Sequence, residues 1–360
     1  MVGKTKREIN FGVETEGECK AALKVDSRPW TKGQRKRVIL DVDTGSDDAI
    51  AIMLAALSPE LDLLGITVTW GNRPVENCVE NTLRVLELLG KENEIPVYRG
   101  CPQPMVRYLT KQRNASLEKD GISVVKDGKE YSVHPAHLDL PPAAASAKKL
   151  HACSYLVETL LRAEEKVTLI PVGPPTNLGM AIRMEPSIIE HVEEVVFMGG
   201  AVGMGNITPC AEANFYHDPE AAKIILDSGV PCRIIGLNAT HSAELSLDDA
   251  AVLKKLGTPA ACLASDLIRT RIEALMVIGD GNGYSDAIHD ALAVASVIVP
   301  EVITDMRRSR CDIDINGGAA DGQLIVDTRI RYEGETGINT QIAYRADKKR
   351  FFDLLCRRLG

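Results

Sequence analysis

Short apolar runs rich in Val, Ile and Leu alternate along this chain with segments of helical periodicity, and this alternation limits the possible folds most strongly. The runs are continuous, as in strands that are buried on both faces of a sheet. Such interleaving predicts an α/β fold with a mostly parallel central sheet covered by helices, whose ligands bind beyond the carboxyl ends of the strands. The predicted strands are 38–43, 61–70, 167–173, 194–200 and 232–238, and the predicted helices are 47–57, 75–90, 151–165, 176–184 and 218–228.

The domain organisation predicted from the sequence is simple. No linker rich in Pro, Gly or Ser interrupts residues 37–360, so we expect a single domain there. Residues 1–36 lack the apolar stretch of a secretory signal, and we interpret them as a mobile N-terminal extension. Residues 106–150 break the alternation, being polar at first and then rich in Pro and Ala. This segment is expected to be an insertion or a lid.

Composition excludes several classes of function. The 360 residues carry a net charge of −8, which argues against nucleic-acid binding, and the one basic cluster, at 31–37, is short. No window approaches the roughly 18 apolar residues of a membrane span. The nine cysteines are scattered without a C-x-x-C pair, as in reduced thiols. We therefore expect a cytoplasmic protein that acts on small molecules and binds neither nucleic acid nor membranes.

The segment VILDVDTGSDDAIAIMLAAL, residues 38–57, holds four aspartates around the predicted end of the first strand and the start of the next helix. Carboxylates at a helix start can cap it, which accounts at most for Asp47 and Asp48. Asp43 and Asp48 are expected to face one crevice, and buried like charges need a partner. A hard divalent cation with oxygen ligands would relieve their repulsion, so the pattern predicts a metal site.

One resemblance is to the haloacid-dehalogenase-like phosphatases, in which D-x-D-x-T follows a strand and a G-D-x-x-x-D segment comes later. DVDTG is similar to the first motif, and GDGNGYSD at 279–286 is similar to the second. This resemblance implies a magnesium-dependent phosphatase in which Asp41 accepts the phosphoryl group, Asp43 acts as acid and base, and Asp280 and Asp286 help to hold the metal. It gives no role to the two aspartates at the start of the predicted helix.

A second resemblance, to the inosine-uridine-preferring nucleoside hydrolases, covers roughly residues 36–330. DVDTGSDDA is similar to that family's D-x-D-x-G-x-D-D motif at every specified position. Four further segments follow in the family's order: GN at 71–72, IPVGPPTNLGMA from Ile170, MGGAVGMGNITPCAEANFYHDPEAA from Met198, and IHDALAVA from Ile288. The resemblance implies a Rossmann-like nucleoside hydrolase fold and hydrolysis of the N-glycosidic bond of ribonucleosides to free base and ribose. A non-catalytic nucleoside-binding protein is the further alternative.

The resemblance also implies catalytic and metal-binding roles. Asp43, Asp48, the backbone carbonyl of Val172 and Asp290 would hold a calcium ion, Ca2+, which takes six to eight oxygen ligands. Asp43 would accept a proton from the attacking water, and His289 would be the acid for the leaving base. A histidine within an apolar helical run is more often a core residue, so the role of His289 depends on its adjacency to Asp290.

The substrate site implied by the resemblance consists of Asp47, Asn72, Met198, Asn206, Glu212, Asn214 and His241. Asp47 and Asn214 would bind the 2′ and 3′ hydroxyls of ribose, and Asn72 would lie near the 2′ hydroxyl and the attacking water. Asn206 and Glu212 would lie at the 5′ end. The alternatives are an ordinary turn for Asn206 and a helix start with incidental polarity for the segment AEANF.

The base-binding end departs from the family pattern. The only tryptophans, Trp30 and Trp70, give little basis for stacking a base between indoles. VHPAHLDLPP stands where the family carries its H-G-x-x-G-like loop, so either His134 or His137 could replace the family's histidine. A tryptophan-poor pocket lined by histidine favours inosine and guanosine over adenosine and implies purine salvage. The family resemblance further implies a homodimer or homotetramer.

Overall fold

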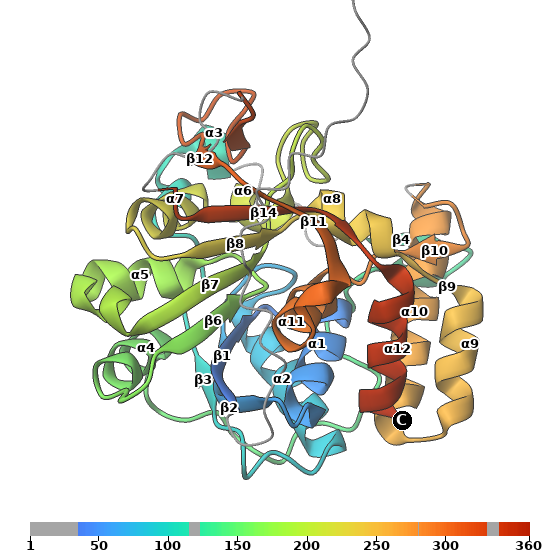
Figure 1. The fold of residues 1–360 in the computed structure, drawn as a ribbon. Helices are drawn as coiled ribbons and strands as arrows, with labels where there is room; N and C mark the ends of the chain where they lie inside the picture. The colour runs from blue at the N-terminus through green and yellow to red at the C-terminus, as the bar shows by residue number, and fades with distance from the viewer. Residues whose placement is uncertain (1–34, 115–122, 280, 330–337) are drawn as a thin grey trace, which may run out of the picture. The chain divides into compact units, whose positions relative to one another are not determined.

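The central sheet of this computed structural model has eight strands: β1 (Lys36–Val42), β2 (Leu61–Val68), β3 (Val97–Arg99), β6 (Val167–Pro171), β7 (Val192–Met198), β8 (Cys232–Ile235), β11 (Ile303–Arg308) and β14 (Thr340–Ala346). Their order is β11-β14-β8-β7-β6-β1-β2-β3 (Figure 1). Neighbouring strands are parallel except β11 and β14. The predicted α/β fold with a mostly parallel sheet is confirmed. The structure describes residues 35–114, 123–279, 281–329 and 338–360.

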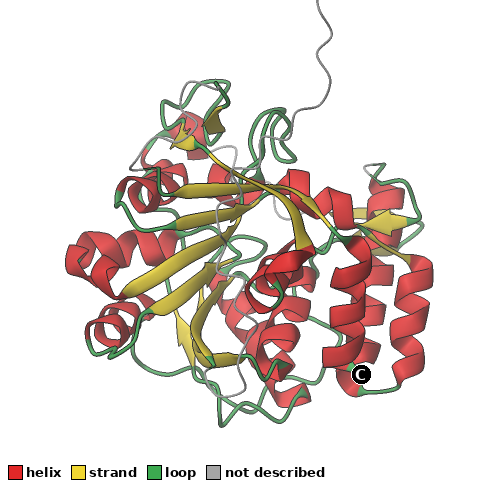
Figure 2. Cartoon of the chain, in the orientation of Figure 1, coloured by secondary structure: helices red, strands yellow, loops and turns green. Residues whose placement is uncertain are grey.

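Helices surround the sheet (Figure 2). The longer ones are α1 (Ser46–Leu57), α2 (Val75–Leu88), α4 (Ala152–Leu161), α5 (Thr176–Met184), α7 (Pro219–Asp227), α9 (Leu247–Leu256), α10 (Pro259–Ile278), α11 (His289–Ile298) and α12 (Lys348–Leu359). The short ones are α3 (Lys111–Asn114), α6 (Ala213–His217), α8 (Leu237–Thr240), η1 (Arg107–Leu109), η2 (Pro186–His191), η3 (His241–Ala243) and η4 (Pro300–Val302). In the described part of the chain, no helix is both long and apolar enough to cross a membrane.

The core has two parts, because successive residues of a strand point to opposite faces of the sheet. Val38 and Leu40 of β1 belong to an apolar cluster that includes residues of α1, α10 and α11. Ile39, between them, belongs to a second cluster that includes residues of α4, α5 and α7. Both faces of β1 are therefore buried, which explains why the apolar runs of the sequence are continuous.

The expected insertion, 106–150, contains η1, α3 and the hairpin of β4 (Ser123–Lys126) and β5 (Lys129–Ser132). Its start is fixed by buried Arg107, whose guanidinium donates to Asp321 at 2.6 Å. Asp321 lies in the loop between β12 (Arg310–Ile313) and β13 (Leu324–Asp327). Residues 115–122 of the insertion, and residues 1–34 of the expected N-terminal extension, lie outside the described residues. All described residues belong to one compact unit, 34–360.

Candidate active site

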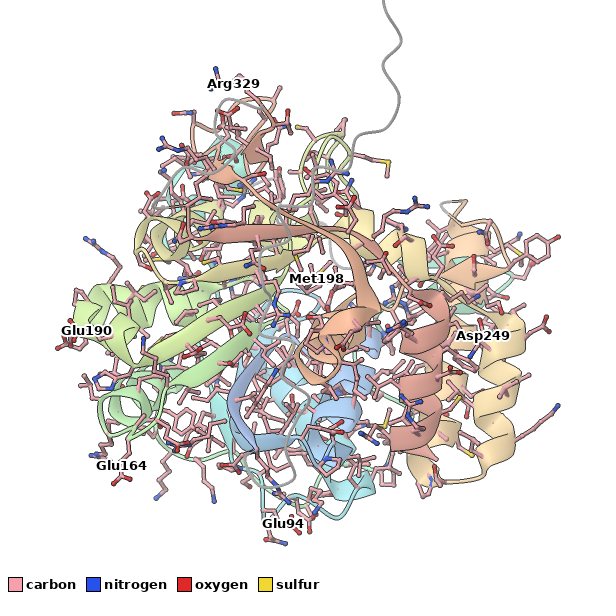
Figure 3. All side chains as sticks on the ribbon, in the orientation of Figure 1. Glu94, Glu164, Glu190, Met198, Asp249 and Arg329 are labelled. Carbon is pink, nitrogen blue, oxygen red and sulfur yellow. The ribbon has the colours of Figure 1, made fainter. Side chains whose placement is uncertain are left out.

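Polar residues converge where β1, β2, β6 and β7 end. Asp43 follows β1, and its Oδ2 accepts the backbone N–H of Asn72, which lies beyond the end of β2, at 2.7 Å. Val172 follows β6, and Met198 closes β7 near the centre of Figure 3. The nucleotide-binding crevice of parallel α/β sheets lies at this edge. The structure therefore places these four predicted site residues at the expected edge of the sheet.

The loop from β1 into α1 is closed by Asp48. Its Oδ1 accepts the N–H of Asp43 at 3.1 Å, and its Oδ2 accepts the N–H of Gly45 at 2.9 Å. The side-chain amide of Asn72 also donates to Oδ2, at 3.1 Å. Asp48 thus caps the helix start, as the simpler interpretation expected. Its contact with Asn72 and its position beside Asp43 also make it part of the crevice.

Three carboxylates, those of Asp47, Asp48 and Asp290, offer oxygens that all lie within 4.8 Å of one another. They form, with Asp43, the aspartate cluster of this article, and all four residues are buried. Burial and then the charges of neighbouring aspartates raise the pKa of Asp48 to about 6. The same causes raise the pKa of Asp43 and of Asp290 well above the usual range. The negative charges of Asp43, Asp48 and Asp290 are therefore not fully compensated by the described residues, and the arrangement is a possible site for a divalent metal.

Two glycines make room for the carboxylate of Asp43. A Cβ on Gly71 would lie 2.1 Å from Asp43 Oδ2, and one on Gly173 would lie 2.6 Å from Oδ1. No real side chain tolerates such distances, so the backbone approaches the carboxylate on two sides. The segments that follow β2 and β6 thus set the position of Asp43.

Asp47 has a partner that we did not predict from the sequence. Arg271 of α10, which is 3% exposed, donates to Asp47 Oδ1 at 3.0 Å and to Ser46 Oγ at 2.9 Å. Its Nε donates to Asp286 at 2.7 Å. Burial alone would raise the pKa of Asp47, but Arg271, His134 and His289 together outweigh it and the pKa is lowered. Asp47 is therefore an oriented carboxylate that is held charged.

Two histidines flank the cluster. His134 Nδ1 lies 3.7 Å from Asp47 Oδ1, whereas His137 is exposed, so the structure brings the first of these two candidates to the site. His289 Nδ1 lies 2.8 Å from Thr240 Oγ1. Burial lowers the pKa of His134 and of His289 to about 4, although the charge of Asp47 acts in the opposite direction. Both imidazoles are therefore neutral at pH 7.

His241 lies next to His289 but is more exposed. The two rings are 5.5 Å apart, edge to face. The Nδ1 of His241 lies 3.1 Å from a carboxylate oxygen of Glu244. We refer to His241 and His289 as the base end of the site. Trp70 donates to Thr176 Oγ1 at 3.3 Å instead of joining this end.

The residues expected around ribose differ in their positions relative to the crevice. Asn214 lies in the crevice, where its amide donates to the carbonyls of Val172 at 2.6 Å and Met198 at 3.1 Å. Glu212 is the N-cap of α6, and its carboxylate accepts three backbone N–H groups. Asn206 is exposed and accepts the N–H of Ala213 at 3.0 Å. Two of these contacts are those of a helix start, the alternative weighed for this segment, and the third, from Gly200, connects Glu212 to the loop after β7.

Asp41, the phosphoryl acceptor of the phosphatase alternative, lies in a different environment. Its Oδ1 accepts the hydroxyl of Thr67 at 2.6 Å and the amide of Asn177 at 2.8 Å. Burial raises its pKa to about 7. Asp280 lies outside the described residues, and Asp286 pairs with Arg271. Asp41 is therefore a buried carboxyl whose described contacts are to neighbouring parts of the fold.

Comparisons with known proteins agree on one family. The model of the family described as inosine-uridine preferring nucleoside hydrolase matches residues 38–353. The pyrimidine-specific ribonucleoside hydrolase RihB of Escherichia coli is 35% identical over 331 residues, covering 89% of this chain and 96% of that protein. The match thus spans nearly the whole length of the relative.

Solved structures show the same fold. The purine-preferring ribonucleoside hydrolase from Gardnerella vaginalis superposes with a TM-score of 0.76 at 29% identity, covering 90% of this chain and 98% of that chain. The plant nucleoside hydrolase PpNRh1 superposes with a TM-score of 0.78 at 26% identity, covering 91% and 99%.

Proposed function

Because this chain belongs to the inosine-uridine preferring nucleoside hydrolase family and is a ribonucleoside hydrolase, we propose that its aspartate cluster binds calcium and directs water to the sugar. The observation that carries the proposal is the cluster of four buried carboxylates beyond the carboxyl ends of the strands, of which only Asp47 is paired with an arginine among the described residues. The phosphatase and non-catalytic alternatives are set aside, because the family model spans residues 38–353.

The calcium ligands would be Asp43, Asp48, Asp290 and the carbonyl of Val172. Oxygen donors of this kind fit calcium. The amide of Asn214 donates to the Val172 carbonyl, and a carbonyl oxygen has a second lone pair with which it could bind a cation. When bound, calcium would offset the carboxylate charge and lower the pKa of water that it coordinates.

The remaining roles, proton transfer, ribose binding and stabilisation of the developing charge, are assigned to residues of the chain. The Asp43 carboxylate takes the proton of the water that attacks the anomeric carbon of ribose. Asp47, oriented and kept charged by Arg271, binds ribose hydroxyls together with Asn214. As the N-glycosidic bond breaks, the sugar acquires oxocarbenium character, which nearby carboxylates stabilise. Ribose hydroxyls bonded in this way make deoxyribonucleosides poor substrates.

His289 acts on the base. Its Nδ1 is held by Thr240, which leaves Nε2 to exchange a proton with the departing base. Burial lowers the pKa of the ring to about 4, so the protonated form is scarce at pH 7. The ring therefore takes up a proton from solvent before it acts, and this proton passes from Nε2 to the departing base, which leaves the ring neutral again.

The base preference that we propose is inosine and guanosine ahead of adenosine. It is supported by the two histidines of the base end and by the position of Trp70, whose indole bonds to Thr176. Uridine is the competing substrate, because the relative that is 35% identical is pyrimidine-specific, whereas a solved relative at 29% identity is purine-preferring. We further propose a homodimer or homotetramer in the cytoplasm, which sedimentation and cell fractionation test.

A direct assay tests the activity. Purified protein is incubated with inosine, guanosine, adenosine, uridine and p-nitrophenyl phosphate, with calcium or with a chelator. We expect reducing sugar from the ribonucleosides, no phosphate release, and loss of activity on chelation. Sugar release that survives chelation, with no calcium found by elemental analysis, would refute the calcium proposal. The highest kcat/KM for uridine or adenosine would refute the base preference alone.

A further inference from the structure

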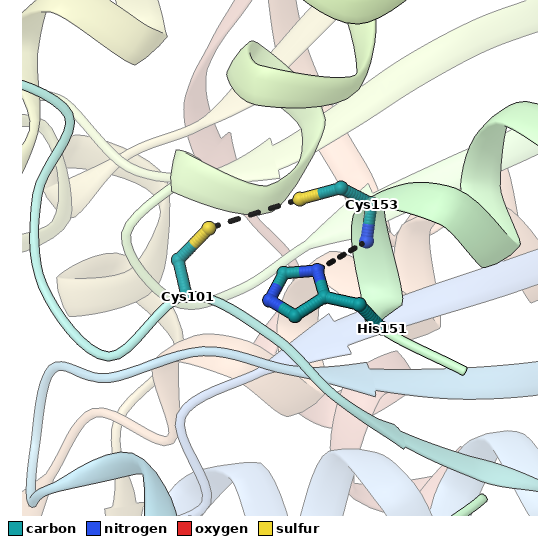
Figure 4. A group of neighbouring side chains, drawn as sticks. All are labelled: Cys101, His151 and Cys153. Carbon is teal, nitrogen blue, oxygen red and sulfur yellow. Dashed lines mark hydrogen bonds between the residues drawn. The ribbon is translucent and has the colours of Figure 1, made fainter. Parts of the chain in front are cut away.

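Two cysteines and a histidine meet outside the aspartate cluster (Figure 4). Cys101 follows the end of β3, His151 is the N-cap of α4, and Cys153 lies in the first turn of that helix. The ligand atoms of the three side chains lie within 4.8 Å of one another. Residues 50 positions apart along the chain thus present two sulfurs and an imidazole to one point.

The spacing of the two sulfurs matches a metal better than a disulfide. Sγ of Cys101 lies 3.7 Å from Sγ of Cys153. A tetrahedral zinc ion with Zn–S bonds of about 2.3 Å holds its two sulfurs about 3.8 Å apart. A disulfide would require the sulfurs to approach to about 2.0 Å. The observed spacing therefore needs almost no adjustment for zinc.

The third ligand is already oriented. His151 Nδ1 accepts the backbone N–H of Cys153 at 3.2 Å, which holds the ring beside the two cysteines with its lone pair facing the helix start (Figure 4). Partial burial of the ring, followed by the charge of Arg99, lowers the pKa of His151, which favours the neutral form that binds metals. Zinc at Nδ1 would replace this capping bond.

We propose that Cys101, His151 and Cys153 bind a zinc ion, with water as the fourth ligand. Cys101 is partly exposed and His151 is exposed, so an ion and a water can reach the site from solvent. The two thiols lose their protons on binding, and the resulting thiolates neutralise the charge of Zn2+. Soft sulfur ligands select zinc, whereas the oxygen ligands of the aspartate cluster select calcium.

The proposed zinc site contacts the network behind the active site. The N–H of Cys101 donates to Asn177 Oδ1 at 2.8 Å, and the amide of Asn177 donates to Asp41. The carbonyl of Cys101 accepts the N–H of Trp70 at 3.2 Å, one residue before Gly71. Zinc would therefore fix the segments that follow β2 and β3, and we expect it to raise the melting temperature.

Cobalt is the probe, because thiolate-bound Co2+ absorbs in the near ultraviolet and oxygen-bound Co2+ does not. The full-length protein, reduced and saturated with calcium, is titrated with Co2+ and then with Zn2+. We expect a thiolate band that saturates at one equivalent and is abolished by one equivalent of Zn2+. No band, or a mass that shows a Cys101–Cys153 disulfide in protein purified under reducing conditions, would overturn the proposal.

Variants separate ligation from folding. We expect Cys101→Ser and Cys153→Ser to lose the band, and His151→Gln to weaken binding by at least about tenfold. Cys262→Ser, which changes a partly exposed cysteine of α10, is the matched control and should keep the band. Cys101 is partly exposed, so its variant remains informative if the buried Cys153→Ser does not fold, and circular dichroism verifies each fold. A band that persists in folded Cys101→Ser would also overturn the proposal.

Discussion

The aspartate cluster is buried, at the end of β1 and in the first turns of α1 and α11, whereas the base end extends from His289 at the start of α11 to His241 at the surface. Asp43 is enclosed by two glycines and bonded to the loop after β2. His241, in contrast, is exposed and held by a single carboxylate. The relatives differ in the same way: all are ribonucleoside or nucleoside hydrolases, but their names divide into pyrimidine-specific and purine-preferring. A buried site suits shared chemistry, and exposed surface segments suit a varying choice of base.

The largest effect is expected at the aspartate cluster. Asp43→Asn keeps the shape of the side chain but removes the proton acceptor and weakens a metal ligand. Turnover of every ribonucleoside should fall by at least about a hundredfold, the usual worth of acid–base catalysis. Steady-state kinetics measure this, with Asp248→Asn on the exposed start of α9 as the matched control. Turnover near the wild-type value would place the base elsewhere.

At the base end, the effect should depend on the leaving group. His289→Ala should slow inosine hydrolysis by about a hundredfold, because the base departs poorly without a proton. p-Nitrophenyl riboside should be almost unaffected, since its leaving group is a stable anion. Comparing kcat for the two substrates therefore tests whether proton transfer at the base end is separate from water activation at the aspartate cluster.

Two outcomes would contradict this separation. Equal losses on both substrates would mean that the substitution disturbs neighbouring Asp290 and hence the metal. An unchanged rate on inosine would return His289 to the role of a packed core residue, and leave proton transfer to His134 or His241.

Calcium should stabilise the aspartate cluster in a pH-dependent manner. Calcium at a hundredfold excess over its Kd should add about 2.7 kcal/mol to the free energy of unfolding. In the calcium-free protein the pKa of Asp48 is raised to about 6, so its contribution to stability is present at low pH and lost as pH rises through about 6. The calcium-dependent increase in melting temperature should therefore be larger at pH 7.5 than at pH 5.5.

Differential scanning calorimetry with and without calcium measures this increase at the two pH values. An increase of equal size at both pH values would show that calcium does not displace protons from the cluster.

Much of the sheet could be predicted from the sequence, because buried parallel strands leave long apolar runs. The predicted strands at 38–43 and 167–173 correspond to β1 and β6 to within two residues at either end. β3 was missed because it has only three residues. β11 (sequence ITDMRR) was missed because it lies at the edge of the sheet and carries polar side chains.

The candidate site was predictable only where a residue belongs to a local motif. The segment at 38–57 indicated Asp43 and Asp48, and both lie in the crevice. Arg271 was missed because α10 carries no motif, and because Arg271 lies 224 positions from Asp47 along the chain. A signal did exist: Arg271 interrupts the apolar stripe formed by Leu267, Ile268 and Ile272, positions that normally face a core. A charge on such a stripe predicts a buried partner, although sequence alone does not identify which one.

Arg271 bonds both Asp47 of the aspartate cluster and Asp286, three residues before His289, and its replacement should have the smallest effect. Arg271→Lys keeps the charge but cannot bond Asp47 and Asp286 as a planar fork does, so kcat/KM should fall by about tenfold. With Asp47 less well paired, its pKa should rise, and the acid limb of the pH profile should move to higher pH, so activity is lost sooner on acidification. Arg269→Lys, on an exposed position of the same helix, is the control. A lower kcat/KM with an unmoved acid limb would limit Arg271 to a structural role.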